Sequence, residues 1–212
     1  MKSLLLGIVV IIIAGFGGLV YRNALEYSAR PIACPVDALV CPDGTSVSRE
    51  GMSCTFPACP PPNVSLLGVG ISFALPGSFE ESELPDAASI AAYASASADS
   101  LSGAAIVIRR YAIAASSTAL ATIEQTALRG TSGVPVGAVA FSSTVLDNRR
   151  FTIVSIERFE GVVDTAYYLA RGADVLRFDA IDRGVAVWTD SNLDTSTLPA
   201  HAALRKLLAT LQ

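Results

Sequence analysis

Few side chains in this sequence are of a type and spacing that could do chemistry. A Ser–His–acid catalytic triad would have to use His201, the only histidine, because the triad needs an imidazole as its general base. No G-x-S-x-G motif occurs, and the nearest approach to it reads Gly130-Thr131-Ser132-Gly133. His201 falls in the first turns of the helix predicted at the end of the chain, so we interpret it as a partly exposed helix residue.

Carboxylates near one another are the second kind of catalytic candidate. Asp179 and Asp182 are close in sequence to Arg177 and Arg183. Because side chains alternate along a strand, Arg177 and Asp179 are predicted to share one sheet face and to pair there. A solvated face with weak ion pairs explains this pattern better than an acid–base enzyme that uses Asp179 or Asp182. We therefore expect no catalysis.

Metal and cofactor motifs are incomplete. Asp190, Asn192 and Asp194 have the alternate spacing of the oxygen ligands in a calcium-binding loop. The pattern then breaks, since Thr195 stands where the loop needs glycine and His201 where it needs a bidentate glutamate. A turn that enters the last helix explains these residues. The sequence contains no phosphate-binding glycine motif either, so we expect neither a metal nor a cofactor.

Arginines and aromatic side chains remain as candidates for ligand binding. These weak candidates are Tyr167, Tyr168, Trp188, Arg109 and Arg110. The arginines could bind an anionic surface polymer and the aromatics could line a groove, although aromatics in a hairpin sheet usually fill its core. The chain has 15 Lys and Arg against 19 Asp and Glu, a formal net charge of -4. This balance offers no basic footprint, so nucleic acid is not expected as a partner.

The four cysteines, Cys34, Cys41, Cys54 and Cys59, are clustered within one short segment. An even, compact set of this kind predicts two disulfide bonds, which would hold together a module over residues 31–60 that has almost no apolar core. Zinc is the alternative, but the spacing contains no CxxC pair and no histidine lies nearby. The residues alone leave the connectivity open.

The pattern CPxDAxxCPDGTxVxRxGxxCxFxxC resembles small cysteine-rich modules beside membrane anchors in bacterial envelope proteins, and also part of a Kazal-type protease inhibitor. The disulfide pairs that the Kazal resemblance implies are Cys34–Cys54 and Cys41–Cys59. It also implies an inhibitory loop at residues 35–40, with Val36 near the primary specificity position. Kazal domains have six cysteines and this module has four, so we expect a structural spacer rather than an inhibitor.

An uninterrupted apolar run, LLLGIVVIIIAGFGGLV, extends from Leu4 to Val20. A bilayer needs about 20 apolar residues, so residues 1–22 are predicted to form a transmembrane anchor that contacts the membrane through residues 4–21. Lys2 favours a cytoplasmic N-terminus, with the bulk of the chain extracytoplasmic. A cleaved signal peptide is the alternative, but its apolar region would be shorter. The run also contributes much of the mean hydropathy of +0.50.

The elements that would position these candidates belong to one domain over residues 66–212, which a proline-rich linker at residues 61–65 separates from the cysteine module. Strands are expected at 70–76, 104–113, 139–145, 151–159, 163–171, 175–181 and 185–188. Residues 87–98 fit either a helix or a strand. Close spacing implies hairpins and a mainly antiparallel sheet.

Two helices complete the predicted domain. Residues 116–118 would cap a helix over 119–128, and Ser196 or Thr197 would cap the last helix. The last helix places Leu204, Leu207, Leu208 and Leu211 on one face, which must be buried against the sheet. The fold class is therefore α+β, a mainly antiparallel sheet covered by helices.

Four segments of this domain resemble the PsbP-like fold, in which helices cover the faces of an antiparallel sheet. They are GISFALPGSF, FEGVVDTAYYLARGADVLRFDAID, VAVWTDSNLD and LRKLLATLQ. Photosynthetic PsbP proteins assist oxygen evolution, whereas anchored bacterial relatives have no assigned activity. The resemblance therefore implies a fold and no photosystem partner.

These observations together predict a membrane-anchored extracytoplasmic protein of the bacterial envelope with a binding or structural role. Its partner would be an unidentified protein or envelope polymer. The alternative is protease inhibition by the cysteine module.

Overall fold

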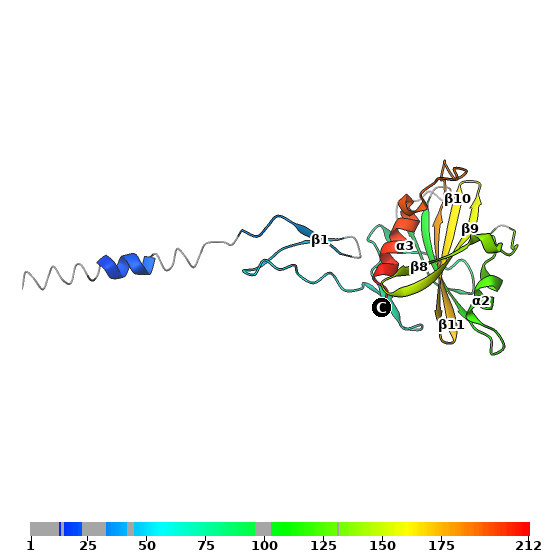
Figure 1. The fold of residues 1–212 in the computed structure, drawn as a ribbon, viewed down its shortest axis with the longest axis horizontal. Coiled ribbons are helices and arrows are strands. Elements are labelled where there is room, and N and C mark those ends of the chain that lie inside the picture. Colours follow the sequence, from blue (N-terminus) through cyan, green and yellow to red (C-terminus); the bar gives the residue numbers. More distant parts are fainter. Residues whose placement is uncertain (1–12, 14, 23–32, 42–44, 96–102, 131) are drawn as a thin grey trace, which may run out of the picture. The chain divides into compact units, whose positions relative to one another are not determined.

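The computed structural model describes residue 13 and residues 15–22, 33–41, 45–95, 103–130 and 132–212 (Figure 1). The chain divides into two compact units, residues 1–39 with 47–58 and residues 40–46 with 59–212. Most of the predicted anchor over residues 1–22 lies outside the described residues. Within the described part, no helix is both long and apolar enough to cross a membrane.

Two disulfide bonds crosslink the cysteine segment, as predicted. Cys34 is bonded to Cys54 and Cys41 to Cys59, which is the pairing that the Kazal resemblance implied. Two short strands, β1 (Ala38–Val40) and β2 (Ser46–Ser48), form a two-stranded sheet here.

Arg49 organises the residues around the first disulfide bond. Its guanidinium binds both carboxylate oxygens of Asp37, at 2.8 and 3.0 Å, and donates to the carbonyl of Cys54 at 3.0 Å. The same group lies 4.2 Å from the centre of the Phe56 ring. Covalent and polar contacts thus take the place of an apolar core in this segment.

The main domain is built on a seven-stranded sheet in which every neighbouring pair is antiparallel. The strands are β5 (Phe79–Glu81), β6 (Ser89–Ser95), β7 (Ala104–Ala112), β8 (Phe141–Leu146), β9 (Arg149–Phe159), β10 (Val162–Arg171) and β11 (Asp174–Asp182). Their order across the sheet is β5-β6-β7-β11-β10-β9-β8. The hairpin from β8 to β9 turns at Asp147 and Asn148, whose positive φ angles of 45° and 60° suit the twist of the flanking strands. A separate antiparallel pair, β3 (Val64–Leu66) and β4 (Ile71–Phe73), precedes the sheet.

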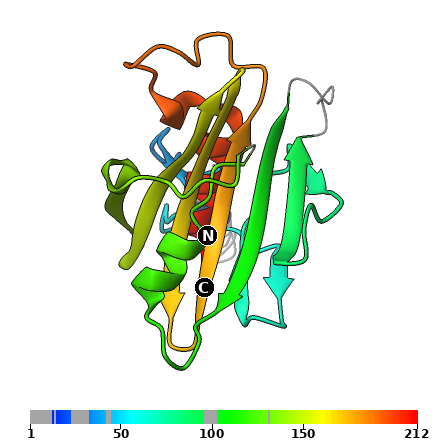
Figure 2. The ribbon, with the colours of Figure 1, turned by 90° about the vertical axis from the view of Figure 1, so that its right-hand side faces the viewer.

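Helices α2 (Ala119–Thr126) and α3 (Pro199–Ala209) cover opposite faces of the sheet (Figure 2). The larger core lies under α3, and its fully buried side chains include Phe73, Phe151, Phe178, Leu204, Leu207 and Leu208. The smaller core lies under α2 and includes Ile123, Val154, Ile156, Tyr168 and Val175. Side chains of β10 and β11 alternate between the two cores, as the period of a strand requires. The predicted α+β class and the buried leucine face of the last helix are confirmed.

Two sequence predictions about secondary structure are decided by the structure. The alanine-rich segment 87–98 contains strand β6 rather than a helix, because residues 89–95 pair with both β5 and β7. The strand expected at 185–188 is wrong. Gly184 adopts a positive φ of 72°, and the amide of Trp188 donates to the carbonyl of Val185 in a turn.

The two helices differ in how their N-termini are capped. Thr118 caps α2 as predicted, since its hydroxyl accepts from the amide of Ala121 at 3.1 Å. For α3 the expected caps are wrong, because Ser196 and Thr197 lie in a separate 3-10 turn, η2 (Thr195–Thr197). The first-turn amides of α3 are satisfied instead by Asp182 at the end of β11.

Candidate functional site

An open groove lies beside α3. It encloses about 790 Å³, within the range of roughly 300–1,000 Å³ that is usual for small-molecule sites. The groove lies between α3 and the residues at the ends of β5, β6, β7 and β11. Its apolar lining comes mainly from Pro76, Phe79, Val185, Leu198, Pro199 and Ala203.

The sequence of α3 explains why a groove forms there. The helix buries its leucines in the core and presents a second stripe of Pro199, Ala202, Ala203 and Lys206 to the groove. These positions recur at i, i+3, i+4 and i+7, so they follow one side of the helix. The two alanines have short side chains and leave space between the helix and Phe79.

Two cations line the groove, Arg183 from the segment after β11 and Lys206 from α3. Both side chains are exposed, and neither makes an ion pair with another described residue. The carboxylate in the lining, Asp182, is 3% exposed and is bound to α3. The groove therefore combines an apolar wall with two cations that have no described counter-ion.

Asp182 fixes α3 against the sheet. Its carboxylate accepts from the amides of Ala200, at 2.9 Å, and His201, at 3.3 Å, and from Nδ1 of the His201 ring at 2.7 Å. Nε2 of the same ring lies 2.9 Å from the hydroxyl of Thr165 on β10. The prediction of a partly exposed His201 is wrong, since the residue is only 1% exposed.

The order hydroxyl, imidazole, carboxylate is that of a catalytic triad, but its surroundings favour a positioning role. The imidazole of His201 is buried, and each of its nitrogens is within hydrogen-bond distance of a protein oxygen. A substrate would have to reach the Thr165 hydroxyl beside Nε2, and the imidazole there is only 1% exposed. The hydrogen bonds from Thr165 through His201 to Asp182 therefore join β10, α3 and β11.

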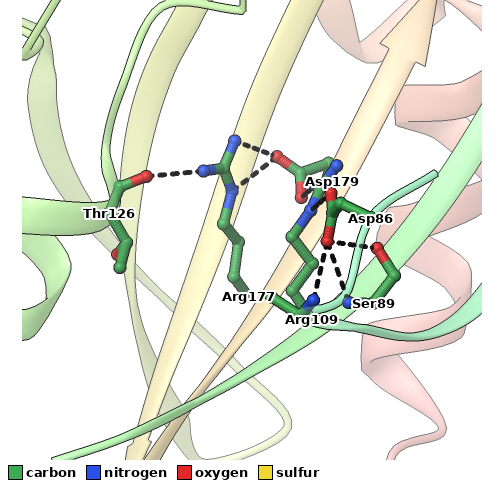
Figure 3. Close-up of polar contacts among 7 residues, drawn as sticks. Asp86, Ser89, Arg109, Thr126, Arg177 and Asp179 are labelled. Carbon is green, nitrogen blue, oxygen red and sulfur yellow. Dashed lines mark hydrogen bonds and ion pairs between the residues drawn. The ribbon is translucent and has the colours of Figure 1, made fainter. Parts of the chain in front are cut away.

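A charge cluster is buried on the opposite face of the sheet, beside α2 (Figure 3). Arg177 donates to the carboxylate of Asp179 at 2.7 Å and to the carbonyl of Thr126, the last residue of α2, at 2.7 Å. Arg109 contacts the other oxygen of Asp179 and binds Asp86 at 2.8 Å. Because Asp179 is 0% exposed and Arg177 only 6%, the predicted solvated face with weak ion pairs is wrong.

Asp164 adds a third carboxyl group to this cluster. It is buried, and its Oδ1 has no hydrogen-bond partner among the described residues. Burial, together with the nearby negative charge of Asp179, raises the pKa of Asp164 well above its usual value. A neutral Asp164 leaves two carboxylates, Asp86 and Asp179, to balance the two guanidinium groups. Burial also raises the pKa of Tyr168 in this cluster to about 12.

The five weak ligand-binding candidates do not converge. Tyr167 lies in the core under α3 and Tyr168 in the core under α2. Trp188 packs against the ring of Phe159, with ring centres 6.2 Å apart, and Arg109 belongs to the charge cluster.

The remaining predicted residues also have structural partners. Arg110 binds Asp174 at 2.7 Å. Asp190 and Asp194 accept from amides two residues further along the chain, as expected for a helix-entry turn. The described residues contain no group of side chains arranged to hold a metal ion. Sequence reasoning missed the groove, whose one local signal is the stripe of small residues on α3.

Comparisons with known proteins are sparse. No model of a protein family matches the chain, and no curated protein matches it. A crystal structure of a protein from Bacteroides thetaiotaomicron VPI-5482 is similar at a TM-score of 0.38 and 9% sequence identity. The match covers 67% of this chain and 44% of that chain, so this chain spans less than half the length of that protein.

Proposed function

We propose that this chain is a membrane-anchored, extracytoplasmic binding protein of the bacterial envelope, whose PsbP-like domain binds a ligand in the groove beside α3. The observation that carries the proposal is the groove itself. Its volume is that of a small-molecule site, and its lining is mostly apolar. Removal of apolar surface of this kind from water lowers the free energy of the system, which favours ligand binding.

Two features support the proposed location. The apolar run from Leu4 to Val20 is long enough for an anchor. The two disulfide bonds are typical of proteins in oxidising compartments outside the cytoplasm. In this proposal the cysteine module and the proline-rich linker at residues 61–65 are a spacer between the anchor and the binding domain, which acts without catalysis.

A titration with an uncharged fluorescent probe tests the binding role. N-phenyl-1-naphthylamine, which fluoresces in apolar sites, is added to the full chain. We expect saturable binding that Ala202→Trp abolishes, because the indole fills the groove. Leu120→Trp is the control, since it adds the same ring at an exposed position on α2. Absence of saturable binding to the native chain, or equal binding to all three proteins, would reject the proposed site.

Protease inhibition by the cysteine module is a second candidate. Val36 is fully exposed, and the residues from 35 to 40 lie between Cys34 and Cys41, each of which is held by a disulfide bond. An exposed side chain on a crosslinked segment could enter the specificity pocket of an elastase-like protease. This hypothesis predicts inhibition by the full chain that Val36→Asp removes. The matched control is Val139→Asp, at an equally exposed valine of the main domain.

A further inference from the structure

We propose that the ligand of the groove is an anionic amphiphile, a single apolar chain with a carboxylate or phosphate head that pairs with one of the two cations of the groove, Arg183 or Lys206. This inference rests on the proposed binding function and specifies the chemistry of its ligand.

The charge of the groove is the first support. Arg183 and Lys206 both line it, and neither has a carboxylate partner among the described residues. The carboxylate of Asp182 does not offset them fully, because it is shared by two amides of α3 and the ring of His201. An anionic group at either end of the groove would therefore meet a cation that no described carboxylate pairs with.

The placement of the cations is the second support. Arg183 follows Asp182, which binds the first turn of α3, so it lies near the N-terminal end of that helix. Lys206 comes seven residues after Pro199 on the same side of α3, about 10 Å further along the axis at 1.5 Å per residue. The apolar stripe of Ala202 and Ala203 lies between these points. A cation at one end of the groove and the apolar stripe beside it therefore match an elongated molecule with one acidic head.

The lining between the cations suits an apolar chain. Phe79 and Ala203 are buried, whereas Leu198 is partly exposed and Pro199 is exposed. These four side chains offer no hydrogen-bonding groups, and the hydroxyls of the lining are those of Ser78 and Ser95, so a sugar with many hydroxyls would lose more contacts with water than this wall replaces. An acyl chain loses nothing by leaving water, and its acidic head can remain at one of the two exposed cations.

Two probes that differ only in charge test the inference. 1-Anilinonaphthalene-8-sulfonate has the scaffold of N-phenyl-1-naphthylamine plus a sulfonate group. We expect the sulfonate probe to bind the full chain about tenfold more tightly than the neutral probe, as one charge-assisted contact implies. The variant with Arg183→Gln and Lys206→Gln should lose this advantage and keep its affinity for the neutral probe. The variant with Arg150→Gln and Arg205→Gln is the control, because both arginines are exposed and outside the groove.

The source of the amphiphile is distinguished by competition. Displacement of the probe by laurate but not by phosphatidylglycerol vesicles indicates a free fatty acid, whereas displacement by the vesicles indicates a lipid headgroup. Laurate should compete better than dodecanol, its uncharged counterpart. Equal affinity for the two probes, or an equal loss of both in the double variant, overturns the anionic ligand and leaves the binding function intact. Failure of both probes to bind overturns the binding function itself.

Discussion

Asp182→Ala tests how α3, one wall of the groove, is held in place. The substitution removes the acceptor for the Ala200 amide, the His201 amide and Nδ1 of the His201 ring. Loss of a helix cap costs about 1 kcal/mol, and each buried donor left without a partner costs about 1–3 kcal/mol. We therefore expect the free energy of unfolding to fall by about 3 kcal/mol. At roughly 2–4 °C per kcal/mol for a domain of this size, the melting temperature should fall by about 6–12 °C.

Urea unfolding followed by circular dichroism measures this loss. Glu124→Ala is the control, because it removes an exposed carboxylate from α2 and should change the unfolding free energy by less than about 0.5 kcal/mol. His201→Ala and the double variant complete a cycle, in which the two effects should not add because the side chains are in direct contact. The reasoning is refuted if Asp182→Ala is no more destabilising than Glu124→Ala, or if the effects at Asp182 and His201 are additive.

Three further predictions concern the charge cluster and the cysteine segment. The fold raises the pKa of Asp164, so the native chain loses stability as pH rises above the pKa of this carboxyl in the unfolded chain. Asp164→Asn, which is neutral at every pH, should therefore be more stable than the native chain at pH 8 and equal to it near pH 4 in urea titrations. An equal difference at both pH values would contradict this. Arg177→Met should destabilise the domain by about 3–5 kcal/mol in the same assay, because it removes the cation that pairs with the buried Asp179. An effect no larger than that of the control Arg150→Met would refute the role of this ion pair. Each disulfide bond stabilises its segment by about 3 kcal/mol, so reduction should allow trypsin to cleave after Arg49, as mass spectrometry would show. Equal cleavage of the oxidised chain would count against this.

The parts of the fold that sequence predicts well are those set by local chemistry. Thr118 caps α2 because a hydroxyl before an apolar helical stretch can accept from the first-turn amides. Asn148 and Gly161 mark hairpin turns because both adopt positive φ angles that few residues tolerate. The leucines of α3 repeat at helical spacing and form one buried face.

Features set by distant contacts are the ones that sequence reasoning missed. Local pattern cannot show that Asp182, rather than Ser196 or Thr197, caps α3, because the cap comes from a strand earlier in the chain. The burial of Arg177 and Asp179 depends on α2 and on the segment around Asp86, which meet only in the folded domain. The groove likewise joins the ends of four strands and one helix, and only its α3 stripe is visible as a pattern.

The most direct test of the central claim is to locate a bound amphiphile. The full chain is labelled with ¹³C and mixed with unlabelled laurate, and isotope-filtered nuclear Overhauser spectra record contacts between ligand and protein protons. The proposal predicts contacts from the acyl chain to the ring of Phe79 and to the methyl group of Ala203, with the amides of Arg183 and Lys206 shifting on titration. Contacts confined to surfaces outside the groove, such as Leu120 or Val139, or no contacts at all, would contradict it.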